Sequence, residues 1–215
     1  QITEATSGII LETVQGEGGL YPATSEFMQG VRKLCDDNDI LLILDEIQCG
    51  MGRSGKMFAY KTFGITPDVM TSAKALGCGV PVGLFAAKGK AANVIEPGDH
   101  GTTYGGNPFV GAAINAVLDI FEKDNILDNV VEVSAYLEKK LDELVAKYDY
   151  MVERRGLGLM QGIEINKAPG EYVVKAQEQG LIILSAGKNV LRFLPPLIVS
   201  KENVDEMIDK LEKCL

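Results

Sequence analysis

Four short stretches of the chain combine residue types that bind or react with charged small molecules. The first is an apolar run, Asp39–Leu44, that ends at Asp45. A carboxylate at the carboxyl end of a buried parallel strand lies where open α/β sheets bind their ligands. The alternative is an aspartate that caps a helix or turns the backbone, and the run alone does not decide between the two.

The second stretch is Ser72–Gly79, where Lys74 stands among small residues with no acidic neighbour in the sequence. Removal from water lowers the pKa of a lysine and makes its amine a nucleophile that forms a Schiff base with a carbonyl group. The alternative is a lysine whose charged end reaches back to solvent, and composition alone favours that alternative.

The remaining two stretches are suited to anions. Thr102 and Thr103 lie in the segment His100–Pro108, just before a predicted helix, where hydroxyls and backbone amides can hold an anion. An ordinary loop is an equal alternative there. Arg192 interrupts the apolar run Val190–Leu194, and a buried arginine needs a partner, either a substrate carboxylate or an internal glutamate.

Together, an acid, a lysine, an anion-binding turn and a buried arginine are what a site for pyridoxal phosphate (PLP) and an amino acid requires. A metal site is not predicted. The four cysteines form no C-x-x-C pair, and the single histidine, His100, is interpreted as a structural loop residue, so the ligands of a structural zinc ion are missing. We interpret the cysteines as thiols in a reducing cytosol.

The elements predicted around these residues alternate between strand and helix in the first half of the chain. Short strands are predicted at residues 8–14, 39–44, 67–71 and 80–86, with the second strand covered on both faces. Ser25 is expected to cap a helix between the first two strands. The apolar face of that helix is expected to consist of Phe27, Val31, Leu34 and Cys35. This alternation predicts an α/β fold with a mainly parallel sheet.

The second half changes to an α+β pattern from about residue 126. Asn107 and Pro108 begin a helix that ends near Lys123, and another helix follows at about 127–148. The remaining predicted elements are strands at 159–165, 181–184 and 190–194, a helix at 170–179 that ends before Gly180, and a last helix capped by Ser200.

Length and composition narrow the class of protein further. The 215 residues are 46% hydrophobic and 24% charged, which excludes a disordered chain. A net charge of −9 argues against a nucleic-acid partner. The longest apolar run, Ile40–Leu44, is far shorter than the roughly 20 residues of a membrane span. With no signal peptide recognised, we expect no membrane partner and a cytoplasmic location. The chain begins at Gln1, so we expect a processed protein or a piece of a longer one.

The candidate segments, taken in order, resemble the C-terminal portion of class-III PLP-dependent aminotransferases, most closely those that act on acetylornithine. The resemblance rests on Leu11–Gly19, Leu44–Gly55, Pro67–Gly77, His100–Pro108 and Leu191–Leu197. It implies PLP-dependent transferase fold type I. Residues 1–125 are then the C-terminal part of the large PLP-binding domain, including a linking helix at about 107–123, and residues 126–215 are a small α+β domain. The complete enzyme would transfer an amino group from N-acetylornithine, or a close ω-amino acid, to 2-oxoglutarate.

The resemblance leaves alternatives open. Aminotransferases for ornithine, succinylornithine and 4-aminobutyrate share most of these residues, and an aminomutase of the same fold is a further option. A truncated module without catalysis is the rival from another class. Complete family members carry an N-terminal half with a Gly/Ser-rich phosphate loop and an aromatic residue that stacks on the cofactor, and no equivalent is found in residues 1–215. We therefore expect the isolated chain to be nearly inactive.

The resemblance also implies roles for residues by their position. Lys74 is similar to the catalytic lysine that binds PLP covalently and moves a proton between substrate and cofactor. Asp45 is similar to the aspartate that pairs with the pyridine nitrogen, and Gln48 to the residue that contacts the ring's 3-hydroxyl. Thr103, with Thr102, is similar to the phosphate ligand donated across a dimer interface, which implies a homodimer.

Two further residues resemble the substrate-binding pair of the family. Arg192 is similar to the arginine that clamps the α-carboxylate. Glu17 is similar to a glutamate that pairs with this arginine for one substrate and swings away for the other. Such an exchange lets one site accept both a basic and an acidic amino acid.

Thr13 stands where relatives often have proline, which changes the stiffness of the strand end and leaves these roles intact.

Overall fold

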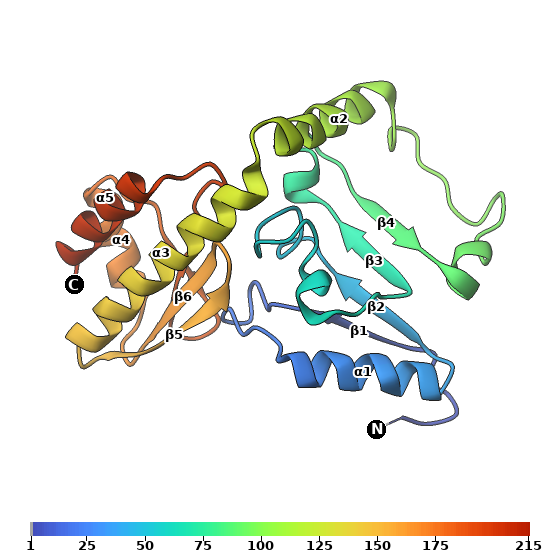
Figure 1. Ribbon diagram of the computed structural model, residues 1–215, viewed down its shortest axis with the longest axis horizontal. Helices are drawn as coiled ribbons and strands as arrows, with labels where there is room; N and C mark the ends of the chain where they lie inside the picture. Colours follow the sequence, from blue (N-terminus) through green and yellow to red (C-terminus); the bar gives the residue numbers. More distant parts are fainter. Residues whose placement is uncertain (1) are drawn as a thin grey trace. The chain divides into compact units, whose positions relative to one another are not determined.

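The computed structural model describes residues 2–215, which fold as two compact units (Figure 1). The first unit contains the chain up to Thr13 together with Ala23–Met51 and Lys56–Asp124. The second contains Val14–Pro22, Gly52–Gly55 and Asn125–Leu215. Two short segments from early in the sequence thus belong to the second unit.

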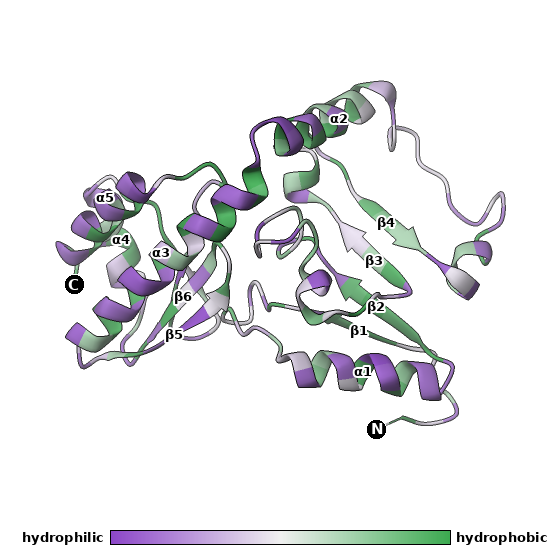
Figure 2. Ribbon diagram, viewed as in Figure 1, coloured by the Kyte–Doolittle hydropathy of each residue, from purple (hydrophilic) through white to green (hydrophobic). Residues whose placement is uncertain are grey.

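A four-stranded sheet forms the centre of the first unit. Its strands are β1 (Gly8–Glu12), β2 (Leu41–Asp45), β3 (Val69–Ser72) and β4 (Leu84–Ala87), in the order β1-β2-β3-β4. The first three strands are parallel, and β4 is antiparallel to β3. The predicted α/β class is confirmed, and all four predicted strands are present with bounds that differ by a few residues. Figure 2 shows β2 and β4 coloured as hydrophobic.

Helices and short 3₁₀ turns lie between these strands or follow the last of them. They are α1 (Ser25–Asp37), η1 (Ala59–Phe63), η2 (Lys74–Leu76), η3 (Gly89–Asn93) and α2 (Pro108–Lys123). Figure 1 shows α1 along one side of the sheet. There Met28 and Cys35 of α1 pack against Leu42 and Leu44 of β2, and Phe63 of η1 completes the core.

The prediction that β2 is covered on both faces is not met by residues 2–215, which cover one face of the strand. Leu42 and Leu44 are fully buried, whereas Leu41 and Ile43 point to the other face and stay partly exposed. The reason is that α1 and η1 both contribute their core residues to the Leu42 face. On the other face Ile10 of β1 is 67% exposed.

The predicted apolar face of α1 is also wrong in part. Met28 and Cys35 are buried, whereas Phe27 and Leu34 are exposed. Both pairs are seven residues apart and form parallel stripes on the helix. The sequence therefore offers two apolar stripes, and only the packed sheet decides which of them is buried.

Two helix caps were predicted in the first unit, and one of the two predictions is correct. Asn107 caps α2 through its side chain, and Pro108 occupies the first helical position as predicted. For α1 the predicted cap, Ser25, is wrong by one residue. The hydroxyl of Thr24 accepts the hydrogen bond from Phe27 N–H at 3.1 Å and caps the helix instead.

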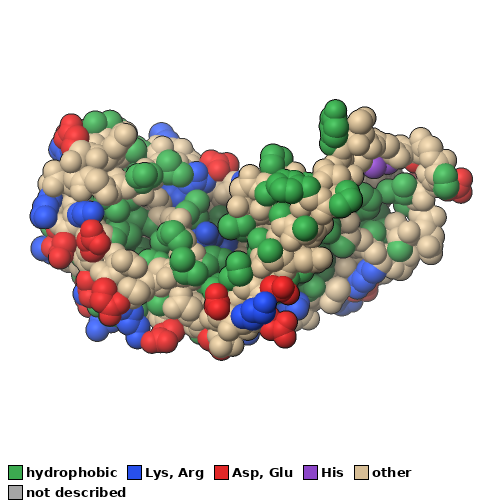
Figure 3. Space-filling view, turned by 90° about the horizontal axis from the view of Figure 1, so that it is seen from above, with side chains coloured by type: hydrophobic (Ala, Val, Ile, Leu, Met, Phe, Trp, Pro, Cys, Tyr) green, Lys and Arg blue, Asp and Glu red, His purple; other side chains and the backbone are tan. Residues whose placement is uncertain are grey.

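Helix α2 has apolar residues around most of its circumference. Of these, Val110 is buried against the described residues. Phe109, Leu118 and Ile120 are exposed. Figure 3, which looks down onto α2, shows hydrophobic side chains gathered on this part of the surface. A helix with apolar residues on all sides is normally buried, so the described residues leave α2 without its full cover.

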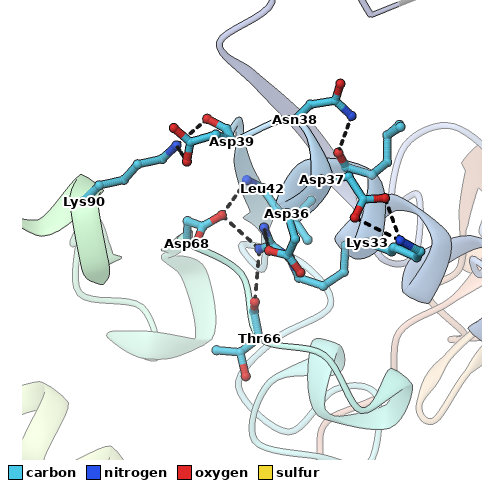
Figure 4. Close-up of polar contacts among 11 residues, drawn as sticks. Lys33, Asp36, Asp37, Asn38, Asp39, Leu42, Thr66, Asp68 and Lys90 are labelled. Carbon is cyan, nitrogen blue, oxygen red and sulfur yellow. Dashed lines mark hydrogen bonds and ion pairs between the residues drawn. The ribbon is translucent and has the colours of Figure 1, made fainter.

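A polar network ties α1 to the sheet (Figure 4). Asp68, just before β3, accepts hydrogen bonds from Arg32 of α1 and from Leu42 N–H of β2, each at 2.9 Å. Arg32 also donates to the carbonyl of Thr66 and pairs with Asp36. Burial by itself would raise the pKa of the Asp68 carboxyl. The hydrogen bonds from Leu42 and Arg32 outweigh that effect and hold the pKa below its ordinary value.

The second unit packs helices against an antiparallel sheet. Its strands β5 (Met151–Leu157), β6 (Met160–Ile165), β7 (Leu184–Ala186) and β8 (Val190–Phe193) follow the order β5-β6-β8-β7, and its helices are α3 (Ile126–Lys147), α4 (Gly170–Glu178) and α5 (Lys201–Glu212). This is the predicted α+β arrangement. Within residues 2–215, no helix combines the length and hydrophobicity needed to cross a bilayer.

Two strands of this unit differ from the prediction. β5 was not predicted, because the charged run Glu153–Arg155 interrupts its apolar alternation. β7 begins three residues later than the predicted strand 181–184, since Leu181 N–H donates to the carbonyl of Ala176 at 2.8 Å and completes the end of α4. The predicted cap of α5 is correct, and Ser200 forms a capping box with Asn203.

Replacing Asp68 by Asn tests whether the polar network stabilises the first unit. At pH 7 the free energy of unfolding should fall by about 1.5–3 kcal/mol, because hydrogen bonds to a charged group are weakened. This deficit should shrink as the pH falls below about 4, since a carboxyl with a lowered pKa stabilises the fold only while it is ionised. Urea unfolding at several pH values measures both effects.

Asp37→Asn is the matched control. Asp37 pairs with Lys33 on the exposed side of α1, so its loss should cost about 0.5 kcal/mol or less. If the Asp68→Asn deficit equals that of the control, or does not change with pH, the network is not the anchor described here.

Candidate active site

The carboxyl ends of β2 and β3 carry the first group of candidate residues. Asp45 is the last residue of β2 and pairs in register with Thr71 of β3. Its Oδ1 accepts hydrogen bonds from Ile47 N–H at 2.8 Å and from the Thr71 hydroxyl at 3.2 Å. These contacts fix the half-buried carboxylate through one oxygen, and the second oxygen can accept from a ligand. The bond from Ile47 is a turn contact, which agrees with the interpretation of Asp45 as a turn residue and leaves its second oxygen available.

Glu46, the residue after Asp45, is a functional candidate that the sequence analysis missed. It is fully buried, and its two carboxylate oxygens accept from Ala59 N–H and Tyr60 N–H, both at 2.8 Å. Burial raises the pKa of this carboxyl, and the two hydrogen bonds offset the rise only in part. They anchor the turn after β2, on which Gln48 lies half-buried. The sequence feature that could have indicated Glu46 is its position, since it is a second acidic residue directly after a predicted apolar strand.

Lys74 follows the carboxyl end of β3 and begins η2. Its φ is +47°, in the left-handed region that costs a residue with a side chain about 1–2 kcal/mol. Such strain is concentrated at functional sites. Of the two sequence interpretations of Lys74, the described chain shows the lysine whose side chain reaches solvent, since its small neighbours leave it exposed. Since β2 and β3 are adjacent and parallel, Lys74 and Asp45 lie at the same edge of the sheet.

Thr102 and Thr103 lie in an exposed loop that leads to the N-terminus of α2. The Thr102 hydroxyl accepts a hydrogen bond from Gly105 N–H at 3.0 Å, which shapes the turn. Exposed hydroxyls before the positive end of a 16-residue helix suit an anion. His100 lies exposed in the same loop and forms an isolated bridge with Pro97.

The second unit carries the other pair of candidate residues. Arg192, on β8, is 8% exposed, and its Nη1 donates to Glu17 Oε1 and to the Gly16 carbonyl, each at 2.8 Å. The Glu17 side chain is 72% exposed. Of the two partners left open by the sequence, the structure shows the internal glutamate. That glutamate lies on a surface turn, whereas the arginine is held within the sheet.

Arg53 is a second arginine that the sequence analysis did not single out. Its guanidinium donates to the carbonyls of Leu159 and Pro195, all within the second unit. Burial lowers the pKa of Arg53 to about 10. The contact with Pro195 fixes the loop that follows β8, the strand that carries Arg192. The sequence signal for this role was the position of Arg53 between two glycines. An arginine exposed on such a turn would have few neighbours to pack against, so its presence there indicates a buried contact.

The cysteines and acidic residues form no metal site in the part of the chain that the structure describes. No disulfide joins the four cysteines there. Cys49 lies buried beside the turn after β2, with its Sγ 3.2 Å from the Thr13 hydroxyl. This contact packs the end of β1 against that turn.

Comparison with known proteins identifies the family. The family description "Aminotransferase class-III" matches residues 1–215. The chain therefore belongs to the class-III aminotransferases, and the prediction from the sequence is confirmed. Acetylornithine aminotransferase of Methanocaldococcus jannaschii is 47% identical over 212 residues, which cover 99% of this chain and 53% of that protein. The chain thus spans about half the length of the curated relatives it matches.

Solved structures share the fold. N-acetylornithine aminotransferase from Stenotrophomonas maltophilia superimposes with a TM-score of 0.86 at 38% identity, over 97% of this chain and 56% of that one. An ornithine aminotransferase from Toxoplasma gondii gives a TM-score of 0.90 at 30% identity, over 95% of this chain and 49% of that one. The latter structure shows partial occupancy of PLP at its active site. The predicted fold type I is confirmed by these similarities.

The exposure of Glu17 predicts that it contributes little to the stability of the second unit. Glu17→Gln should lower the free energy of unfolding by no more than about 1 kcal/mol, because water screens the lost ion pair. Glu164→Gln is the matched control. Glu164 pairs with buried Arg155 and also accepts from Asn189, so its loss should cost about 2–3 kcal/mol. Urea unfolding compares the two variants, and a larger loss for Glu17→Gln would show that Glu17 is a fixed structural residue.

Proposed function

We propose that the complete protein containing this chain is a PLP-dependent aminotransferase. It transfers an amino group from N-acetylornithine, or a close ω-amino acid, to 2-oxoglutarate in two half-reactions. The observation that carries the proposal is the parallel pairing of β2 with β3, which brings the carboxylate of Asp45 and the amine of Lys74 to one edge of the sheet. Membership of the class-III family and similarity to proteins named acetylornithine aminotransferase support it.

The residues at this edge fit PLP. When bound, PLP withdraws electrons from an attached amino acid and acidifies the C–H bond beside its amino group. Asp45 keeps the ring nitrogen protonated, because a carboxylate fixed by Thr71 and Ile47 offers its second oxygen to a positive charge. Gln48 contacts the 3-hydroxyl from the turn that Glu46 anchors.

Lys74 supplies the amine that holds the cofactor covalently and then carries the proton taken from the substrate carbon. Thr102 and Thr103 bind the phosphate of the partner subunit's cofactor, so the proposal includes a homodimer. The exposed side chains of Tyr104 and Phe109, beside these threonines, support an interface there, because aromatic residues of this kind are enriched in subunit contacts.

Arg192 and Glu17 accommodate the two substrates in turn. Arg192 binds a substrate carboxylate as a bidentate partner, and the Gly16 carbonyl keeps its guanidinium in place. Glu17 neutralises Arg192 when the bound substrate has no carboxylate at that point, and it moves into solvent when one arrives. A fixed cation with a movable anion thus lets one site take a basic and an acidic amino acid.

Location and substrate choice complete the proposal. We include a cytoplasmic location in the proposal, since four scattered cysteines without a C-x-x-C pair are typical of thiols in a reducing compartment. Ornithine is the second candidate for the amino donor, because the similar Toxoplasma gondii protein is an ornithine aminotransferase. Activity of the complete protein against acetylornithine, ornithine, succinylornithine and 4-aminobutyrate decides between these donors.

The role of Lys74 is tested by trapping the cofactor on the complete protein. After incubation with PLP, reduction with sodium borohydride and digestion, the peptide that contains Lys74 should carry the pyridoxyl group in mass spectra. Lys74→Ala should lose the label, the cofactor absorbance and transamination of acetylornithine with 2-oxoglutarate. These losses are expected together, because one amine both binds the cofactor and carries the proton.

Lys61→Ala is the matched control for this experiment. Lys61 is also an exposed lysine in a 3₁₀ helix of the first unit, so its variant should keep the label, the absorbance and the activity. A label on a different lysine refutes the assignment of Lys74. A complete protein that takes up no label favours the non-catalytic alternative.

A further inference from the structure

The turn that carries Glu17 is closed by its own backbone hydrogen bonds. Residues 15–21, the Glu17 turn, belong to the second unit. Gln15 N–H donates to the Tyr21 carbonyl at 3.0 Å. Leu20 N–H donates back to the Gln15 carbonyl at 2.9 Å. Because these bonds join the two ends of the turn, a contact that fixes either end also fixes the backbone of Glu17 between them.

Contacts with the sheet of the second unit hold the backbone of the Glu17 turn. Gly187 N–H, shortly before β8, donates to the Glu17 carbonyl at 2.8 Å. Leu20 is fully buried and faces Gly162 of β6, where an added Cβ atom would come within 3.2 Å of the Leu20 side chain. The Glu17 side chain, in contrast, is 72% exposed. The backbone is therefore fixed, whereas the side chain that pairs with Arg192 can turn into solvent.

The last residue of the turn, Tyr21, stacks on a buried arginine of β5. The Cζ atom of Arg155 lies 3.8 Å from the centroid of the Tyr21 ring. The Arg155 side chain is 6% exposed, and its two terminal nitrogens pair with Glu153 and Glu164. Because the N–H bonds of a guanidinium lie in its plane, these ion pairs leave its flat face to the aromatic ring.

The sheet holds Arg155 more firmly than it holds Tyr21. Arg155 pairs in register with Gly162 of β6, and its partner Glu164 also accepts from the Asn189 side chain at 3.2 Å. Tyr21 is 49% exposed. A cation–π contact is stronger when the cation is removed from water. The fixed arginine therefore restrains the end of the Glu17 turn through the tyrosine ring.

We propose that Arg155 and Tyr21 are positioning residues for the exchange of Glu17 at Arg192. Their stack keeps the Glu17 turn in place, so that Glu17 leaves Arg192 by rotation of its side chain alone. The closed pair is then ready when the bound substrate is N-acetylornithine, and an arriving dicarboxylate displaces one side chain rather than a loop. This inference rests on the proposed function, in which Arg192 and Glu17 accommodate the two substrates in turn.

The alternative is a stack that only stabilises the second unit. Its loss would then slow both half-reactions to the same extent, or neither of them. A positioning role predicts unequal effects. A loosened turn weakens the pair of Glu17 with Arg192, which the half-reaction with acetylornithine requires, whereas 2-oxoglutarate binds when that pair is open. The ratio of kcat/KM for the two half-reactions therefore separates the two roles.

The test measures each half-reaction separately, in single turnovers of the complete protein loaded with PLP. Tyr21→Leu should lower kcat/KM for acetylornithine about three- to tenfold, because the cation–π contact is lost. The value for 2-oxoglutarate should change less than about twofold. Tyr21→Phe keeps a ring for the cation and should match the wild type in both. Tyr148→Leu is the matched control, since Tyr148 also lies beside a cation, Lys147, in the second unit.

Hydrogen exchange on the same proteins adds a readout that does not depend on activity. The backbone amides of Leu20 and Gly187 should exchange faster in Tyr21→Leu than in the wild type, while those of α5 should not change. The proposal is overturned if both half-reactions slow equally, if Tyr21→Phe behaves like Tyr21→Leu, or if the two amides exchange as in the wild type. A wild type that transaminates neither substrate refutes the proposed function, and the two amides alone then decide whether the stack holds the turn.

Discussion

The register between β2 and β3 is the constraint on which the candidate site depends. It pairs Asp45 with Thr71 and leaves the following lysine at the same edge of the sheet. A slip by one residue would turn Asp45 toward the face covered by α1. Contacts at both ends hold the register: Asp68 accepts from Leu42 N–H, and Glu46 N–H donates to the Thr71 carbonyl. The Asp68 carboxylate at one end and the Glu46 backbone at the other therefore position Asp45.

The charged candidate residues differ in how firmly their surroundings hold them. The fixed groups lie on or directly after strands, where hydrogen bonds and burial restrict them, as at Glu46 and Arg192. The movable group, Glu17, lies on a surface turn. A buried charge keeps its orientation, whereas an exposed partner exchanges with little change in free energy.

Local signals in the sequence were sufficient for much of the fold. The apolar run before Asp45 predicted a strand, and the Asn107–Pro108 pair predicted the start of α2, since both depend on neighbouring residues. Which stripe of α1 is buried was not predictable, because it depends on the sheet. The pairing of Arg192 with Glu17 joins residues 175 positions apart, so the resemblance suggested it and spacing alone did not.

The most direct measurement is a crystal structure of the complete protein grown with PLP. We predict continuous electron density between the Lys74 Nζ and the cofactor, with an Asp45 oxygen within about 2.7–3.2 Å of the ring nitrogen. Both features follow from the edge that β2 and β3 share. Density that joins the cofactor to another lysine, or a ring nitrogen that faces away from Asp45, would contradict the central claim.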